Sequence, residues 1–226
     1  MNPKSLRQRV IVKLVSQFHR PRGAGGRMAG WVMAHRGSNR QRSRWVVSLL
    51  DVRPTDRVLE IGFGPGLAIA ELAGRATRGH VYGIDHSEVM TRQASKRNAA
   101  AIRDGRVDLV HTGVDRLPHF DGPLDAIVAV NTVGFWPDPA ARLSELRGLL
   151  RPGGRIALAS QPRCPGATAD TTVRAGEELR DLVRRAGFDA PRTETLALSP
   201  PVACVIARNL DGERSRLDGE PDPACG

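Results

Sequence analysis

Alternating apolar and polar stretches predict a parallel sheet with helices between its strands. Short apolar runs suited to buried strands occupy residues 57–61, 80–84, 107–111, 124–130 and 155–160. Segments with a helical spacing of apolar residues follow at about 66–75, 88–101, 138–150 and 172–186. Such β/α alternation is typical of an α/β domain. Two more strands, 193–198 and 202–207, are joined by a short proline turn, which predicts antiparallel neighbours.

The two ends of the chain have a different pattern. Residues 5–19 carry apolar residues at helical spacing and predict an amphipathic helix, which either packs on its own domain or lies on a membrane surface. A basic, glycine-rich turn at 19–26 separates it from a short helix at 28–35, and a third helix, capped by Ser38 or Asn39, precedes the first strand. Residues 209–226 are polar and charged and are expected to be disordered.

The stretch Val58–Gly66 carries the first candidate chemistry. It predicts a buried strand with Glu60 near its tip, followed by a loop with glycines at 62, 64 and 66 that opens a helix. A dinucleotide fingerprint would have glycine or alanine at the position of Leu67. A carboxylate here also suits a cationic ligand better than a pyrophosphate. A nicotinamide-dependent oxidoreductase remains an alternative at this point.

This combination resembles the first motif of the class I S-adenosylmethionine-dependent methyltransferases. The resemblance covers residues 45–208 and implies a doubly wound, mostly parallel seven-stranded sheet with a C-terminal antiparallel strand. It implies that S-adenosylmethionine is the cofactor, and that Glu60, Gly62, Phe63, Gly64 and Gly66 surround its methionine part. We therefore expect the cofactor-binding domain at 46–208. The first 40 residues and the tail at 209–226 are outside the resemblance, and we expect residues 1–45 to form a helical lid that opens at the glycine-rich turn.

Later segments agree with this resemblance. Asp85 ends the second strand, where an acid can accept both hydroxyls of a ribose, and Asp85-His86-Ser87 with Met90 resembles the second motif of the family. After the third strand, Gly113 and Val114 correspond to the adenine contacts of the family. Gly113 has no side chain for a hydrogen bond to the adenine amine, which leaves Asp115 or a backbone carbonyl for that role.

The resemblance also implies where the methyl acceptor binds. Asn131, after the fourth strand, would contact the methionine end of the cofactor. The resemblance places Phe135 and Trp136, in the loop after the fourth strand, on the acceptor side. Trp31 and His35, from the expected lid outside the resemblance, are further expected acceptor contacts. Core packing of the two loop aromatics is an equally good alternative. A hydroxyl acceptor would need a general base, for which His35, His111 and His119 are candidates by chemistry alone, so the catalytic residue is left open.

Composition changes the picture in one respect. The 226-residue chain has a net charge of +10, and residues 1–57 hold 13 basic and 2 acidic residues. Such a segment could attract nucleic acid or anionic lipid, either as a nucleic-acid methyltransferase or as a binding module without a cofactor; a solvated basic face is the alternative. Residues 131–134 lack the prolines of the base-amine methyltransferases, so a small molecule or lipid is the favoured acceptor.

The remaining composition argues against other classes. The three cysteines have no metal-ligand spacing, so no metal is expected and a reducing cytoplasm is the expected compartment. No apolar run is long enough to span a membrane. The oligomeric state is not indicated by any pattern.

Overall fold

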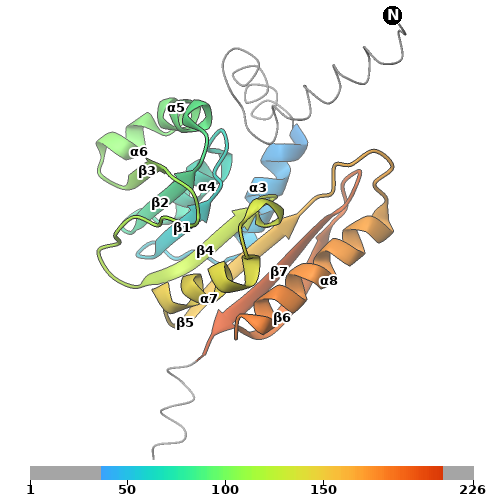
Figure 1. Cartoon of the computed structure of the whole chain (residues 1–226). Helices are drawn as coiled ribbons and strands as arrows, with labels where there is room; N and C mark the ends of the chain where they lie inside the picture. The colour runs from blue at the N-terminus through green and yellow to red at the C-terminus, as the bar shows by residue number, and fades with distance from the viewer. Residues whose placement is uncertain (1–36, 211–226) are drawn as a thin grey trace, which may run out of the picture.

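A computed structural model of the chain describes residues 37–210, which form one seven-stranded sheet with helices on both faces (Figure 1). The strands are β1 (Arg57–Ile61), β2 (His80–Asp85), β3 (Val107–His111), β4 (Leu124–Val130), β5 (Leu150–Ser160), β6 (Asp189–Leu196) and β7 (Val202–Asn209). The helices are α3 (Gly37–Leu49), α4 (Leu67–Arg75), α5 (Glu88–Arg97), α6 (Ala99–Arg103), the 3-10 turn η1 (Val133–Phe135), α7 (Pro139–Leu149) and α8 (Ala169–Arg185).

The strand order is β3-β2-β1-β4-β5-β7-β6. Strands β1 to β5 pair in parallel, whereas β7 is antiparallel to both β5 and β6. The predicted mostly parallel sheet with an antiparallel C-terminal strand is therefore confirmed. The chain leaves β1 toward β2 on one side and later returns to β4 on the other. In open α/β sheets such a reversal opens a crevice at the carboxyl ends of the strands, where ligands bind.

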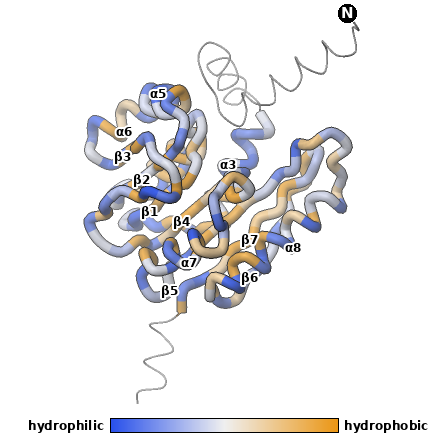
Figure 2. Tube along the Cα trace, viewed as in Figure 1, coloured by the Kyte–Doolittle hydropathy of each residue, from blue (hydrophilic) through white to orange (hydrophobic). Residues whose placement is uncertain are grey.

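Two hydrophobic clusters hold the layers together. Helices α3, α4 and α5 bury Val46, Ile69 and Ala94 against one face of the sheet. Helices α7 and α8 bury Leu143 and Val183 against the other face. Figure 2 shows hydrophobic residues concentrated along the central strands, whereas the helices alternate between hydrophobic and hydrophilic residues. This arrangement places the carboxyl ends of five parallel strands along one edge of the molecule.

Several predicted boundaries differ from the structure. The single helix expected over 88–101 is two helices, because the Asn98 side chain donates hydrogen bonds to the carbonyls of Gly66 and Ala94 where α5 ends. Helix α8 begins at Ala169 rather than Thr172, because Thr168 caps it in a capping box. Ser38 and Asn39 lie inside α3, so neither caps it.

Most of the segments predicted at the two ends of the chain lie outside residues 37–210, and part of the predicted tail lies inside them. The lid helices and the glycine-rich turn within residues 1–36, and the tail from residue 211 onward, lie outside the described residues. Asn209, which we assigned to the tail, is the last residue of β7 and donates a hydrogen bond from its side chain to the Leu150 carbonyl. None of the described helices has the length and apolar character to span a membrane.

Candidate cofactor and acceptor site

The glycine loop lies at the carboxyl end of β1, where hydrogen bonds tie it to β2. The Gly62 N–H donates to the Ile84 carbonyl at 2.8 Å, and the Gly64 N–H donates to Oδ2 of Asp85, also at 2.8 Å. Gly62 and Gly66 both have a positive φ, a conformation that residues with a side chain rarely adopt. The tip of β1, the loop and the acid at the end of β2 therefore form one structural unit.

Two glycines of this loop serve different purposes. A Cβ on Gly62 would stand 2.3 Å from Cγ2 of Thr132, so the β4 loop packs directly on the backbone there. A Cβ on Gly64 would meet no atom of residues 37–210 within 4 Å. Gly62 is thus required by packing within the protein, whereas Gly64 leaves a bare stretch of backbone with open space in front of it.

Asp85 organises the loop as well as ending β2. Its Oδ1 accepts the Ser87 N–H at 2.8 Å while Oδ2 accepts that of Gly64. Ser87 in turn caps α5 through its hydroxyl, which accepts the Met90 N–H. Burial raises the pKa of Asp85, and the two backbone N–H groups partly oppose that rise.

Glu60 is the second carboxyl of the site and is only 3% exposed. Burial, together with the nearby charge of Asp85, raises the pKa of Glu60 well above its usual value, against the effect of a hydrogen bond from the Ile69 N–H. Its Oε2 has no hydrogen-bond partner among the described residues. A buried carboxyl with an unsatisfied oxygen, near the Asp85 carboxyl to which Gly64 is hydrogen-bonded, fits a ligand that carries positive charge and donor groups.

The ends of β3 and β4 complete this edge of the sheet. The Thr112 N–H, just before Gly113, donates to the Asp85 carbonyl at 3.0 Å. Asn131 has a left-handed backbone with φ of 59°, and its Oδ1 accepts the Gln161 N–H at 2.7 Å. Of the ten residues predicted to bind the cofactor, all lie along the ends of β1 to β4 or in the loops that follow.

The side chains of the predicted contacts differ in exposure. Phe63 and Val114 are buried and pack within the hydrophobic clusters of the core. His86 is half exposed, and its carbonyl contacts the His111 ring nitrogen Nε2 at 3.0 Å. Trp136 is 8% exposed and packs within the core cluster, which favours the packing alternative for that residue.

The remaining acceptor predictions have mixed outcomes. Phe135 is 57% exposed in η1 and remains a candidate acceptor contact. Trp31 and His35 lie outside the described residues.

Several supports of the site were not apparent in the sequence. Arg97 donates from Nε to the Pro65 carbonyl at 2.9 Å, and Asn98 donates to that of Gly66, so α5 holds the glycine loop from outside. Thr132 donates its hydroxyl to the Ile61 carbonyl at 3.1 Å and ties the β4 loop to the end of β1. These partners are 32 to 71 residues apart in the chain, and no local pattern signals such contacts.

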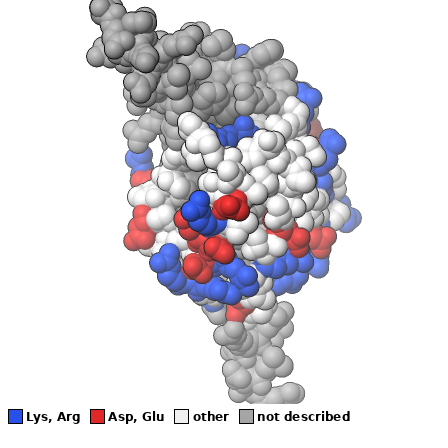
Figure 3. Space-filling view, turned by 90° about the vertical axis from the view of Figure 1, so that its right-hand side faces the viewer, with Lys and Arg blue, Asp and Glu red and all other residues white. Residues whose placement is uncertain are grey.

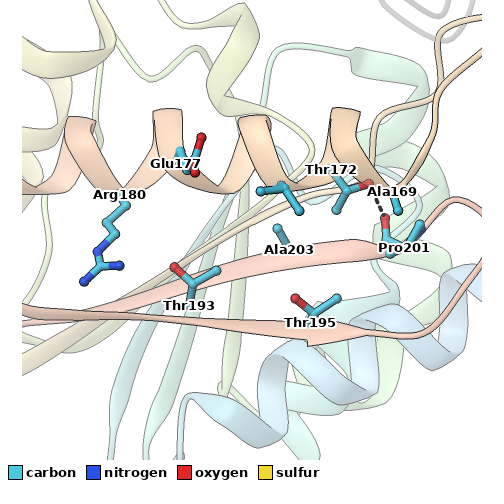
Figure 4. A pocket seen from close by; sticks show the side chains of 9 residues that line it. Ala169, Thr172, Glu177, Arg180, Thr193, Thr195, Pro201 and Ala203 are labelled. Atoms are coloured by element: carbon cyan, nitrogen blue, oxygen red, sulfur yellow. Dashed lines mark hydrogen bonds between the residues drawn. The ribbon is translucent and has the colours of Figure 1, made fainter.

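Two hollows of the described surface lie outside the ends of β1 to β4. One, of about 320 Å³, lies between α8 and the strands β6 and β7, with Thr172, Arg180 and Thr193 among its lining residues (Figure 4). The other, of about 420 Å³, includes Arg57 and His80 at the amino ends of β1 and β2. Neither contains a predicted site residue. Loops at the amino ends of parallel strands are also the opposite edge from the one where ligands of such sheets bind.

Charge on the described surface is mixed where Figure 3 displays it. On that face acidic side chains gather near the middle, with basic ones beside and below them. Eight of the 13 basic residues within 1–57 belong to residues 1–36, which are not described. The potential metal ligands of the described residues form no cluster that could hold an ion.

Comparison with known proteins agrees with this geometry. A profile of the methyltransferase domain family matches residues 58–154. The chain is 29% identical over 182 residues to an uncharacterized methyltransferase, YdaC, of Bacillus subtilis, covering 80% of this chain and 97% of that protein. It is 33% identical over 186 residues to 27-O-demethylrifamycin SV methyltransferase of Amycolatopsis mediterranei, covering 76% of this chain and 68% of that one.

A solved structure shares the fold. The N-methyltransferase NodS of Bradyrhizobium japonicum superposes with a TM-score of 0.60 at 18% identity, covering 79% of this chain and 91% of that one. The sheet topology, the glycine loop after β1 and the two acids Glu60 and Asp85 are together typical of a nucleoside-binding α/β enzyme. Together with the sequence relatives, they establish that this chain belongs to the class I S-adenosylmethionine-dependent methyltransferases.

Proposed function

We propose that this methyltransferase acts on a small molecule or a lipid, which binds over the carboxyl ends of β4 and β5. The cofactor would lie along the ends of β1 to β3. In this arrangement Glu60 accepts hydrogen bonds from its amino-acid part, Asp85 accepts the ribose hydroxyls, and Gly113 with Val114 borders the adenine. The observation that carries the proposal is the unsatisfied Oε2 of Glu60 beside the open face of Gly64.

The residues of this chain would contribute mainly by binding and orientation. When bound, the cofactor supplies a methyl group already activated by its sulfonium. Glu60 and Asp85 are held by their strands and by backbone N–H groups, so little of their freedom is lost when they bind. Holding two reactants at near-attack distance is worth about 7–11 kcal/mol in favourable systems. Asn131 and Phe135 would border the reacting end.

The relatives support a small-molecule acceptor without identifying it. The Amycolatopsis relative is named for a demethylrifamycin, a small molecule, and this chain spans 68% of its length. No feature of residues 37–210 favours the nucleic-acid alternative.

Gly64→Ala tests the proposed position of the cofactor. The added methyl group would fill open space, so the fold should tolerate it apart from about 1–2 kcal/mol of backbone strain at φ 52°. The methyl group would, however, occupy the proposed position of the cofactor. We expect the dissociation constant of S-adenosylhomocysteine, measured by calorimetry, to rise by about tenfold or more, which corresponds to about 1.4 kcal/mol.

Gly74→Ala is the matched control, because Gly74 is a helical glycine of α4 whose Cβ would also meet nothing within 4 Å. It should bind S-adenosylhomocysteine as the wild-type protein does. Equal affinities for the two variants would place the cofactor elsewhere and refute the proposed site.

A further inference from the structure

Two arginine side chains converge on one oxygen at the carboxyl end of β5. Arg42, from α3, donates from Nη1 to Oε1 of Gln161 at 2.6 Å. Arg163 donates from Nη2 to the same oxygen at 2.8 Å and to Oδ1 of Asn39 at 2.9 Å. Gln161 is itself fixed, because its Nε2 donates to the Pro200 carbonyl at 2.7 Å. Two positive charges are thus held together by a neutral amide.

Within this cluster, the buried positive charge of Arg42 has no counter-ion among the described residues. The side chain belongs to a residue only 9% exposed, and its Nε has no hydrogen-bond partner among the described residues. Arg42 also forms no ion pair with any described carboxylate. Burial, and then the positive charge of Arg163, lower the pKa of Arg42 to about 10. A buried charge without a counter-ion is costly, and a bound anion would remove that cost.

The cluster lies on the acceptor side of the proposed site. The Gln161 N–H donates to Oδ1 of Asn131, so the arginines adjoin the end of β4. Strand β5 is separated from β1 by β4, and neighbouring strands are about 4.8 Å apart, which puts the cluster about 10 Å from the tip of β1. Arg163 is exposed, so the cluster is accessible to a ligand from solvent. Glu60 and Asp85, the two acids of the proposed cofactor site, lie on the other side of β4.

We propose that Arg42 and Arg163 bind an anionic group, a carboxylate or phosphate, on the methyl acceptor. The inference rests on the proposed function, because it takes the end of β5 to be the acceptor side. Planar guanidinium groups match the oxygens of such anions and bind them through charge-assisted hydrogen bonds. The acceptor would then be held by its anionic group at the β5 end, with its nucleophilic atom directed toward β4 and the cofactor.

Anion binding to the full-length protein, saturated with S-adenosylhomocysteine, tests the proposal. The probes are acetate, benzoate and inorganic phosphate, with benzamide as the neutral counterpart of benzoate and chloride at equal ionic strength as the reference. We expect at least one anion to raise the melting temperature of the wild-type protein beyond the chloride reference, while benzamide does not. Arg42→Met and Arg163→Gln should each lower the affinity for that anion by about tenfold, the effect of losing one charge-assisted hydrogen bond.

Arg44→Gln is the matched control, because Arg44 is an exposed arginine of the same helix that pairs with Glu71. It should respond to anions as the wild-type protein does. If Arg42→Met fails to fold, the exposed Arg163→Gln variant still decides the outcome. A wild-type protein that no anion stabilises beyond chloride, or a folded Arg163→Gln variant with unchanged anion affinity, overturns the proposal.

A second arm separates the acceptor from the cofactor. If the arginine variants lose affinity for S-adenosylhomocysteine but keep it for 5′-methylthioadenosine, which lacks the amino-acid part, the pair holds the carboxylate of the cofactor and the acceptor assignment is wrong. Unchanged S-adenosylhomocysteine affinity with lost anion binding supports it. Failure of the wild-type protein to bind S-adenosylhomocysteine at all would instead refute the proposed function.

Discussion

Replacing Asp85 by asparagine should separate its two roles, in folding and in binding. The carboxylate now accepts the N–H groups of Gly64 and Ser87, one on each oxygen. Asparagine has one acceptor oxygen, so one backbone donor would face an NH₂ group and lose its partner, at a cost of about 1–3 kcal/mol. Burial, however, makes the ionised carboxyl costly in the folded state, as its raised pKa indicates, and the neutral amide removes that cost. The two effects oppose each other, so the net change in unfolding free energy should be small.

Binding has no such compensation. The proposed ribose hydroxyls would lose a charged acceptor, and each charge-assisted hydrogen bond is worth about 1.5–3 kcal/mol. We therefore expect the dissociation constant of S-adenosylhomocysteine to rise by about tenfold to more than a hundredfold. Isothermal calorimetry measures this change, and urea unfolding of the cofactor-free protein measures the stability of the same variant.

Asp108→Asn is the appropriate control, because Asp108 is an exposed aspartate of β3 whose carboxylate lies 2.9 Å from Nε2 of His80. It should bind S-adenosylhomocysteine normally. An Asp85→Asn protein that folds and binds within twofold of the wild-type affinity would show that Asp85 does not hold the ribose.

Two further predictions concern buried charges. Because burial and Asp85 raise the pKa of Glu60, ionisation of Glu60 costs the folded state stability as the pH rises above the unfolded value of about 4.3. Glu60→Gln should therefore increase the unfolding free energy of the cofactor-free protein at pH 8, by an amount that shrinks as the pH falls. The same variant should bind S-adenosylhomocysteine more weakly. Urea unfolding from pH 5 to 8 checks the stability, and a variant less stable than the wild-type protein at pH 8 contradicts the prediction. Arg155→Met should lower the unfolding free energy by about 3–5 kcal/mol, because it leaves the buried Asp56 carboxylate without its ion pair and the Leu50 carbonyl without a donor; a loss under 1 kcal/mol in urea would argue against this account.

Local pattern was enough to predict most of the fold. The apolar runs identified β1, β3 and β4 with the bounds that the structure has. For β1 and β4 the reason is that central strands covered on both faces are mostly apolar, whereas β3 lies at the edge of the sheet and is largely exposed. The helix expected at 138–150 is α7, with Asp138 as its N-cap, accepting the Ala141 N–H, and Pro139 as its first residue. The break at Asn98 was not predicted, because it depends on the carbonyl of Gly66, which lies far away in the sequence.

The site was predicted less completely than the fold. The acids and glycines of the candidate site stood out because they occupy strand ends and a loop of recognisable spacing, and their roles in binding stay a prediction. Tertiary structure then distinguished Phe135, which is exposed, from its neighbour Trp136, which is buried, although the sequence treated them alike. The lid contacts that the sequence predicts within residues 1–36 stay a prediction.

The sequence by itself determined the order of strands and helices and the class of the cofactor site, because periodicity and strand-end residues are local properties of the chain. Only the tertiary structure decided which distant groups meet. It gave Asp85 the N–H of Gly64 as a partner, left one oxygen of Glu60 unsatisfied, and brought Arg42 to Gln161 across 119 residues. Such contacts depend on how helices pack on the sheet, and that packing is a property of the whole core rather than of any one segment.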